Sequence, residues 1–185
     1  MSLIVSKSRD YRDHLLERSA QLLLRTGMSA NMMTWLSCLF GIMSINFLFR
    51  DQLWFALLIF LHLLADAFDG VMARLSEPTN FGKYFDYGTD ELIAFLILIK
   101  IALQLQDYYV YIIIAICFLT QAVYLLSKFS YPVLFFRTAI AIIMCFNFYP
   151  FTFLPIPIIA YLTAGVISLY SLSMQFTYVL RTRFH

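Results

Sequence analysis

Four aspartates in two closely spaced pairs are the residues of this sequence best suited to chemistry. Asp66 and Asp69 are three residues apart, and Asp86 and Asp90 are four apart. Residues at these spacings share one face of a helix. Both pairs fall in strongly apolar stretches, where an ionisable group costs about 2.5 to 3.5 kcal/mol at the bilayer centre and usually has a function.

Carboxylates that converge in a medium of low dielectric repel one another unless cations neutralise them. Oxygen ligands without histidine or thiolate favour Mg²⁺, Mn²⁺ or Ca²⁺ over zinc or copper. Two such ions can neutralise a pyrophosphate and stabilise the entering and leaving oxygens of a phosphoryl transfer. The residues alone leave a simpler alternative, in which the four acids pair with Arg74 and Lys83 to hold two helices together. Two bases cannot neutralise four acids, which favours a metal site.

Small residues beside the aspartates leave room for a ligand. Gly70 and Gly82 carry no side chain and Ala73 carries a methyl group, so a nucleotide or a neighbouring helix can approach closely. Arg74 follows Asp69 and Gly70 by about one helical turn, where its guanidinium can contact a phosphate or hold a carboxylate. Both roles of Arg74 are compatible with one site.

The elements that must carry these residues are membrane helices. Hydrophobic residues make up 62% of the 185 residues and charged residues only 13%, against about 25% charged in an average soluble domain. A membrane-spanning helix needs about 20 apolar residues. We expect six such helices, at residues 29–49, 53–75, 84–105, 109–127, 131–149 and 155–179. The short connection at 76–83 makes the second and third helices antiparallel neighbours, so the two aspartate pairs can face each other.

The expected fold is an all-α integral membrane protein with one domain over residues 1–185. Residues 1–27 form an amphipathic segment, expected to lie on the membrane surface as a helix, with a solvated helical tail as the alternative. Residues 28–180 form the six-helix bundle. The distribution of Lys and Arg places both termini and the aspartates on the cytoplasmic side. The net charge of +2 and the scattered basic residues argue against nucleic-acid binding.

The segment Asp66-Ala-Phe-Asp-Gly-Val-Met-Ala-Arg74, followed by Gly82, Asp86 and Asp90, resembles the signature of the CDP-alcohol phosphotransferase family. That signature is D-x2-D-G-x2-A-R, then seven or eight residues, then G-x3-D-x3-D, and every fixed position is matched. The resemblance implies a phospholipid-biosynthetic transferase. Such an enzyme moves a phosphatidyl group from CDP-diacylglycerol, or a related CDP-linked donor, to the hydroxyl of a polar alcohol or phospho-alcohol and releases CMP.

The resemblance also implies roles for individual residues. Two ions, Mg²⁺ or Mn²⁺, would be held by Asp66, Asp69, Asp86 and Asp90, and Asp90 would be the general base. A second segment, Ala30 to Thr34, is similar to the P-N-x-x-T segment of many members, with Ala30 in place of the proline. On residue type alone, Asn31 and Thr34 could equally cap a helix. The residues implied in CDP binding are Asn31, Thr34, Asp66, Asp69, Gly70, Ala73, Arg74, Thr79 and Gly82.

The acceptor alcohol is less well specified. Lys128 and Arg137, near the cytoplasmic ends of the fourth and fifth expected spans, are candidate contacts for a phosphorylated acceptor. The positive-inside rule explains both residues equally well. Tyr87 and Glu91 occupy places where related inositol-phosphate enzymes often carry Ser and Arg, which disfavours that acceptor.

Two alternative functions remain. Residues 85–90 are similar to the corresponding segment of choline and ethanolamine phosphotransferases, in which the CDP carries the head group and a lipid is the acceptor. A divalent-cation transporter is a more distant alternative, because the acids gather at one end of the spans rather than along a pathway. The expected partners are a CDP-linked lipid donor, a small polar alcohol, membrane lipids and, as a homodimer, a second copy of the chain.

Overall fold

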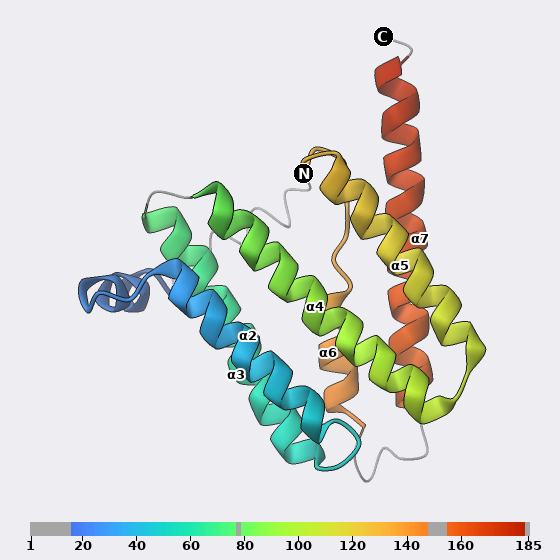
Figure 1. Cartoon of the computed structure of the whole chain (residues 1–185), viewed down its shortest axis with the longest axis horizontal. Coiled ribbons are helices and arrows are strands. Elements are labelled where there is room, and N and C mark those ends of the chain that lie inside the picture. The colour runs from blue at the N-terminus through green and yellow to red at the C-terminus, as the bar shows by residue number, and fades with distance from the viewer. Residues whose placement is uncertain (1–15, 77–78, 148–154, 184–185) are drawn as a thin grey trace. The chain divides into compact units, whose positions relative to one another are not determined.

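Helices make up the regular secondary structure of the part of the chain that the computed structural model describes, residues 16–76, 79–147 and 155–183. Residues 16–25 form a first helical stretch. The helices that follow are α2 (Ala30–Phe47), α3 (Gln52–Leu75), α4 (Asn80–Leu105), α5 (Tyr108–Leu126), α6 (Arg137–Cys145) and α7 (Ile156–Arg183) (Figure 1). The expected all-α class is confirmed over these residues.

Four of these helices are long and apolar enough to cross a membrane, namely α2, α3, α5 and α7. This agrees with a multi-pass membrane protein. Helix α4 is 26 residues long but carries the acids Asp86, Asp90 and Glu91 together with Lys100. Helix α6 has only nine residues. The expected arrangement with six spans therefore stays a prediction.

The fifth expected span, 131–149, begins later than the hydropathy pattern predicts. Residues 131–136 are not helical, and α6 starts at Arg137. Pro132 has no N–H to give to a helix and disfavours a helical conformation at the residue before it. The backbone N–H of Leu134 instead donates to Oγ of Ser171 on α7 at 2.9 Å. Residues 148 and 149 lie outside the described residues.

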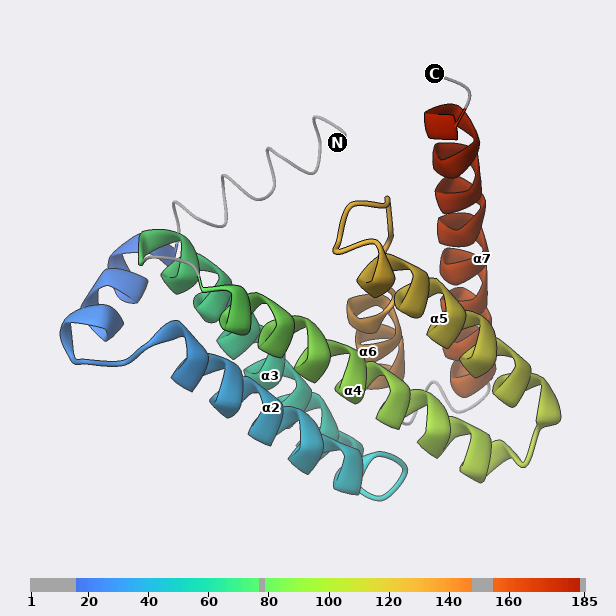
Figure 2. The ribbon, with the colours of Figure 1, turned by 45° about the horizontal axis from the view of Figure 1, so that its top comes forward.

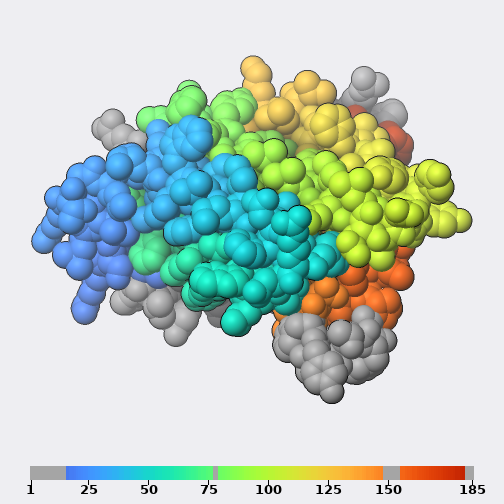
Figure 3. All heavy atoms as spheres, turned by 60° about the horizontal axis from the view of Figure 1, so that its bottom comes forward, coloured from blue at the N-terminus to red at the C-terminus, as the bar shows by residue number. Residues whose placement is uncertain are grey.

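The helical residues 16–25 pack against the helices that carry the aspartates. Ala20 is fully buried in a cluster with Met33 of α2 and with Ala65 and Met72 of α3. Leu22 points away from this cluster and is 61% exposed, and Figure 3 shows residues 16–25 and α2 on one face of the molecule. The first 15 residues of the expected segment 1–27 lie outside the described part of the chain. Contact with a membrane surface stays a prediction for this segment.

The chain divides into two compact units, which are described separately. The first takes in the chain up to Asn46 together with Ala56–Asp90, and the second takes in Phe47–Phe55 and the chain from Glu91 onwards. The expected single domain over 1–185 is not tested by this division. All of the residues implied in metal and CDP binding belong to the first unit.

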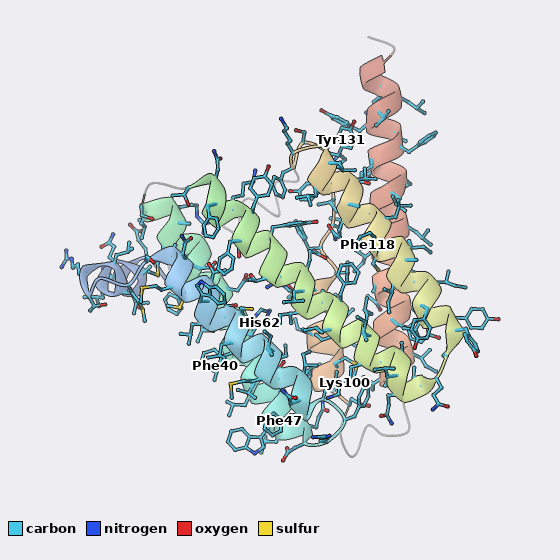
Figure 4. All side chains as sticks on the ribbon, in the orientation of Figure 1. Phe40, Phe47, His62, Lys100, Phe118 and Tyr131 are labelled. Carbon is cyan, nitrogen blue, oxygen red and sulfur yellow. The ribbon has the colours of Figure 1, made fainter. Side chains whose placement is uncertain are left out.

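A buried polar contact joins α2 to α3 within the first unit. Ser37 Oγ donates to the carbonyl oxygen of His62 at 3.0 Å and lies 2.9 Å from Nδ1 of the same residue. Both side chains are buried, His62 completely, and His62 is labelled in Figure 4. Because His62 precedes Asp66 by one helical turn, this contact sets the rotation of the part of α3 that carries Asp66 and Asp69.

In the second unit, α7 packs against both α5 and α6 (Figure 2). A Cβ atom on Gly165 of α7 would lie 3.2 Å from Cδ1 of Ile113 on α5, so the missing side chain permits a close approach. Thr120 Oγ1 lies within 3.3 Å of the carbonyl oxygen of Ser168 on α7 and donates to it. Small residues and hydroxyl groups of this kind are typical of helix contacts in membranes.

Candidate functional site

Three of the four aspartates meet in the first unit. One carboxylate oxygen from each of Asp66, Asp69 and Asp86 lies within 4.8 Å of the other two. Asp66 and Asp69 come from α3, and Asp86 comes from the second turn of α4. The prediction that the two helices bring their acids together is confirmed for these three residues.

The three aspartates fit a hard divalent cation. The group contains neither histidine nor cysteine, and its ligand atoms are oxygens, which Mg²⁺ and Mn²⁺ prefer. The Asp69 side chain is only 4% exposed. Two carboxylate oxygens, Oδ2 of Asp69 and Oδ1 of Asp86, are buried and accept no hydrogen bond from the described residues. Each of these residues has other interactions in the protein. Buried carboxylate oxygens without a donor are stabilised when a cation binds them.

Asp90 lies outside this group of three. It follows Asp86 by one helical turn on α4 and is half-buried. A metal-ligand role for Asp90 stays a prediction, as does its role as general base.

A pocket of about 390 Å³ lies beside the three aspartates within the first unit. Its walls combine carboxylates, cations, hydroxyl and amide groups, and small residues. The lining residues are Ser29, Ala30, Asn31, Thr34, Asp69, Gly70, Ala73, Arg74, Ser76, Thr79, Gly82, Lys83 and Asp86. Eight of the nine residues implied in CDP binding are among them; Asp66 is the exception.

Local structure explains why Asn31 and Thr34 are available to a ligand. Ser29 caps α2, because its Oγ accepts from the backbone N–H of Met32 at 3.3 Å. Asn31 and Thr34 lie inside the helix, where Thr34 Oγ1 donates to the carbonyl oxygen of Ala30 at 3.1 Å. The alternative in which Asn31 and Thr34 cap a helix is therefore wrong.

Gly82 allows α4 to start against α2. Thr79 Oγ1 accepts from the backbone N–H of Gly82 at 3.0 Å and caps α4. A Cβ atom on Gly82 would lie 3.0 Å from this oxygen and 2.9 Å from Oδ1 of Asn31. Real Cβ atoms essentially never come within 3.0 Å of another atom, so a side chain at this position would have to displace the Asn31 amide. Gly70 is less tightly surrounded than Gly82, because a Cβ atom there would lie 3.6 Å from Nη1 of Arg74, an ordinary van der Waals distance.

The two candidate acceptor contacts belong to the second unit and have different surroundings. Lys128 is exposed. Arg137 is only 8% exposed, and its charge acts on Glu91, a carboxylate that is 7% exposed. Sequence reasoning noted Glu91 only as a departure from a family pattern and missed that its side chain is buried.

Sequence reasoning also gave no site role to four residues that line the pocket, Ser29, Ala30, Ser76 and Lys83. A signal for Lys83 was present, because it precedes Asp86 by three residues and Asp90 by seven, which places all three on one face of α4. Ser29 and Ser76 carry no such pattern. They line the pocket because the start of α2 and the end of α3 come together there.

Comparison with known proteins agrees with the geometry of this site. The family model for CDP-alcohol phosphatidyltransferase matches residues 28–182, most of the chain. A comparison with curated protein sequences gives no match. The family match covers both aspartate pairs and the residues that line the pocket from Ser29 to Asp86. The chain therefore belongs to the CDP-alcohol phosphatidyltransferase family.

Proposed function

We propose that the chain is a phospholipid-biosynthetic transferase that moves a phosphatidyl group from CDP-diacylglycerol, or a related CDP-linked donor, to the hydroxyl of a polar alcohol or phospho-alcohol. CMP is the second product. Family membership supports the transfer of a phosphatidyl group from a CDP-linked donor to an alcohol. The observation that carries the proposal is the convergence of Asp66, Asp69 and Asp86 beside a pocket lined by Asn31 and Arg74.

In this proposal the pocket binds the CDP part of the donor. Asn31, Thr34 and Thr79 offer amide and hydroxyl groups, while Gly70, Ala73 and Gly82 leave space for the nucleotide. Arg74 offers charged donors to phosphate oxygens. Asp66, Asp69, Asp86 and Asp90 hold two Mg²⁺ or Mn²⁺ ions, which when bound stabilise the negative charge on the phosphate oxygens.

Asp90 is the proposed general base. Its carboxylate accepts the proton of the acceptor hydroxyl as the hydroxyl oxygen attacks the phosphorus of the phosphatidyl group. The new oxygen–phosphorus bond forms while the bond between that phosphorus and the CMP oxygen breaks, so the proton ends on Asp90 and the electron pair on CMP. No covalent enzyme intermediate is needed. Half-burial of Asp90 and its one-turn spacing from Asp86 on the same helix support this role.

We also propose that both termini and the active site face the cytoplasm, with Lys128 and Arg137 as candidate contacts for a phosphorylated acceptor. The distribution of Lys and Arg in the sequence supports this orientation. Labelling of single cysteines placed near each terminus, in sealed cells with an impermeant reagent, tests it. Protection of both positions until the membrane is opened is the expected result, and labelling of either in sealed cells contradicts it.

The proposed function is tested by CMP release from CDP-diacylglycerol. The purified chain is assayed in detergent or nanodiscs with Mg²⁺ or Mn²⁺ and a panel of alcohols and phospho-alcohols. We expect release that depends on one acceptor and on the metal. A second arm supplies CDP-choline and CDP-ethanolamine with diacylglycerol, which is the reaction of the alternative with a lipid acceptor.

Two variants make this assay specific. Asp90→Asn removes the proposed base and should abolish acceptor-dependent CMP release. Asp51→Asn removes a carboxylate at the start of α3, where Asp51 Oδ1 accepts from the backbone N–H groups of Leu53 and Trp54. Asn caps helices as well as Asp does, so this control should keep full activity. Absence of binding to every CDP-linked donor would contradict the proposed function.

A further inference from the structure

Lys83 is a charged residue in the wall of the pocket to which the family signature gives no role. The signature fixes Gly82 before it and Asp86 after it, and leaves position 83 open. The pocket wall nevertheless includes Lys83 together with Arg74, Asp69 and Asp86. Its cations therefore come from two helices, Arg74 from the last turns of α3 and Lys83 from the first turn of α4.

The start of α4 is arranged to accept an anion. Thr79 Oγ1 caps the helix at Gly82, and the backbone N–H of Lys83 donates to the carbonyl oxygen of Thr79 at 3.2 Å. The first turn of α4 contains no acidic residue. The N–H groups of Gly82 and Lys83 are thus already bonded within the chain, and what this end of the helix offers an anion is the partial positive charge of a helix N-terminus. A lysine on this turn adds a full charge at the same end of the pocket.

The charge balance of the site points to the group that Lys83 meets. Two divalent ions would balance the four carboxylates of Asp66, Asp69, Asp86 and Asp90. Arg74 and Lys83 are the cationic side chains that line the pocket beside these carboxylates. A CDP-linked donor carries a diphosphate diester with two negative charges, which Arg74 and Lys83 together would neutralise. Arg74 alone would leave half of that charge without a protein cation.

We propose that Lys83 binds the diphosphate of the CDP-linked donor and, with Arg74, forms the cationic side of the diphosphate site. The inference rests on the proposed function and deepens it, because it adds a donor-binding residue from outside the signature. Lys83 acts by binding and positioning the donor. Its contact is with the phosphates rather than with the cytosine or the ribose.

The test compares the affinities of CDP and cytidine for the whole chain in nanodiscs with Mg²⁺, measured by calorimetry or by competition. Lys83→Met should weaken CDP binding by about tenfold or more, as expected for the loss of a charge-assisted hydrogen bond. Cytidine binding should change by less than about twofold, since cytidine lacks the phosphates on which the charge acts. Lys83→Arg should restore most of the CDP affinity because it keeps the charge.

Lys100 provides a matched control, since it lies on the same helix and is not among the residues that line the pocket. Lys100→Met should leave both affinities unchanged. An equal loss of CDP and cytidine affinity in Lys83→Met, or no loss of either, would overturn the inference about Lys83. If the unmodified chain binds neither CDP nor a CDP-linked donor, the proposed function itself fails. Melting temperatures of all variants show whether any loss reflects unfolding.

Discussion

A Cβ atom on Gly82 would lie 2.9 Å from Oδ1 of Asn31, so the first turn of α4 passes directly against a side chain of α2. The two residues are 51 positions apart in the sequence and line the same pocket. The family signature on α4 and the second segment on α2 are thus parts of one site, and the absent side chain at Gly82 is what lets them meet.

Gly82→Ala should weaken donor binding more than it weakens the fold. The added methyl group must displace the Asn31 amide and Thr79 Oγ1, and we expect CDP affinity to fall by about tenfold, which corresponds to about 1.4 kcal/mol and lies within the usual cost of overpacking. The higher helix propensity of Ala, worth up to about 1 kcal/mol, offsets part of the loss in stability. CDP titration and thermal unfolding measure the two effects.

Gly88→Ala is the matched control for this substitution. Gly88 lies on the same helix, and a Cβ atom there would have nothing within 4 Å. This variant should gain stability through helix propensity and keep its CDP affinity. Equal CDP affinities for Gly82→Ala and Gly88→Ala would show that the approach of Asn31 to Gly82 has no part in binding.

Asp86→Asn should reduce the stabilisation of the chain by Mg²⁺. A ligand at 100 times its dissociation constant stabilises a folded protein by about 2.7 kcal/mol. The variant lacks one of three converging carboxylates, so Mg²⁺ should raise its melting temperature by less than half as much. Asp51→Asn removes a carboxylate that is not part of this cluster and keeps the helix cap, so this variant should respond to Mg²⁺ like the unmodified chain. A full response to Mg²⁺ in Asp86→Asn would argue against a metal at this cluster.

Ser37→Ala should destabilise the first unit through its contact with His62. The substitution removes a hydrogen bond between α2 and α3 and leaves buried polar atoms of His62 with fewer partners, which typically costs about 1 to 3 kcal/mol. Ser44 is also fully buried on α2, but its hydroxyl bonds to the carbonyl oxygen of Gly41 in its own helix. Ser44→Ala should therefore cost less. Unfolding by SDS in mixed micelles compares the variants, and equal losses would rule out a special role for the Ser37–His62 contact.

Glu91→Leu should destabilise the second unit if the opposite charges of Glu91 and Arg137, both buried, stabilise each other. Where two buried charges do form an ion pair, removing one partner costs up to about 3 to 5 kcal/mol. The double variant Glu91→Leu/Arg137→Met removes both charges and should be more stable than Glu91→Leu alone. The same unfolding assay, applied also to Arg137→Met alone, completes the double-mutant cycle. Additive losses in the double variant would mean that Glu91 and Arg137 do not stabilise each other.

The sequence by itself determined the family of the protein and the residue types of its candidate site. Spacings of three and four residues placed Asp66 with Asp69 and Asp86 with Asp90 on helix faces, because helical periodicity is a local property of the chain. Apolar length predicted the membrane helices, and the absence of histidine and cysteine among the acids predicted a hard metal. All of these depend on neighbours in the sequence.

The tertiary structure decided which residues meet. It brought Asp86 to Asp66 and Asp69 but left Asp90 outside their group, and it placed Lys83 and Ser29 in the pocket wall. It also made α6 begin only at Arg137, while the backbone N–H of Leu134 before it donates to Oγ of Ser171 on α7. Such contacts depend on how far each helix is rotated about its axis and where it crosses its neighbours. Side-chain packing over the whole helix sets these quantities, and the local pattern of residues does not contain them.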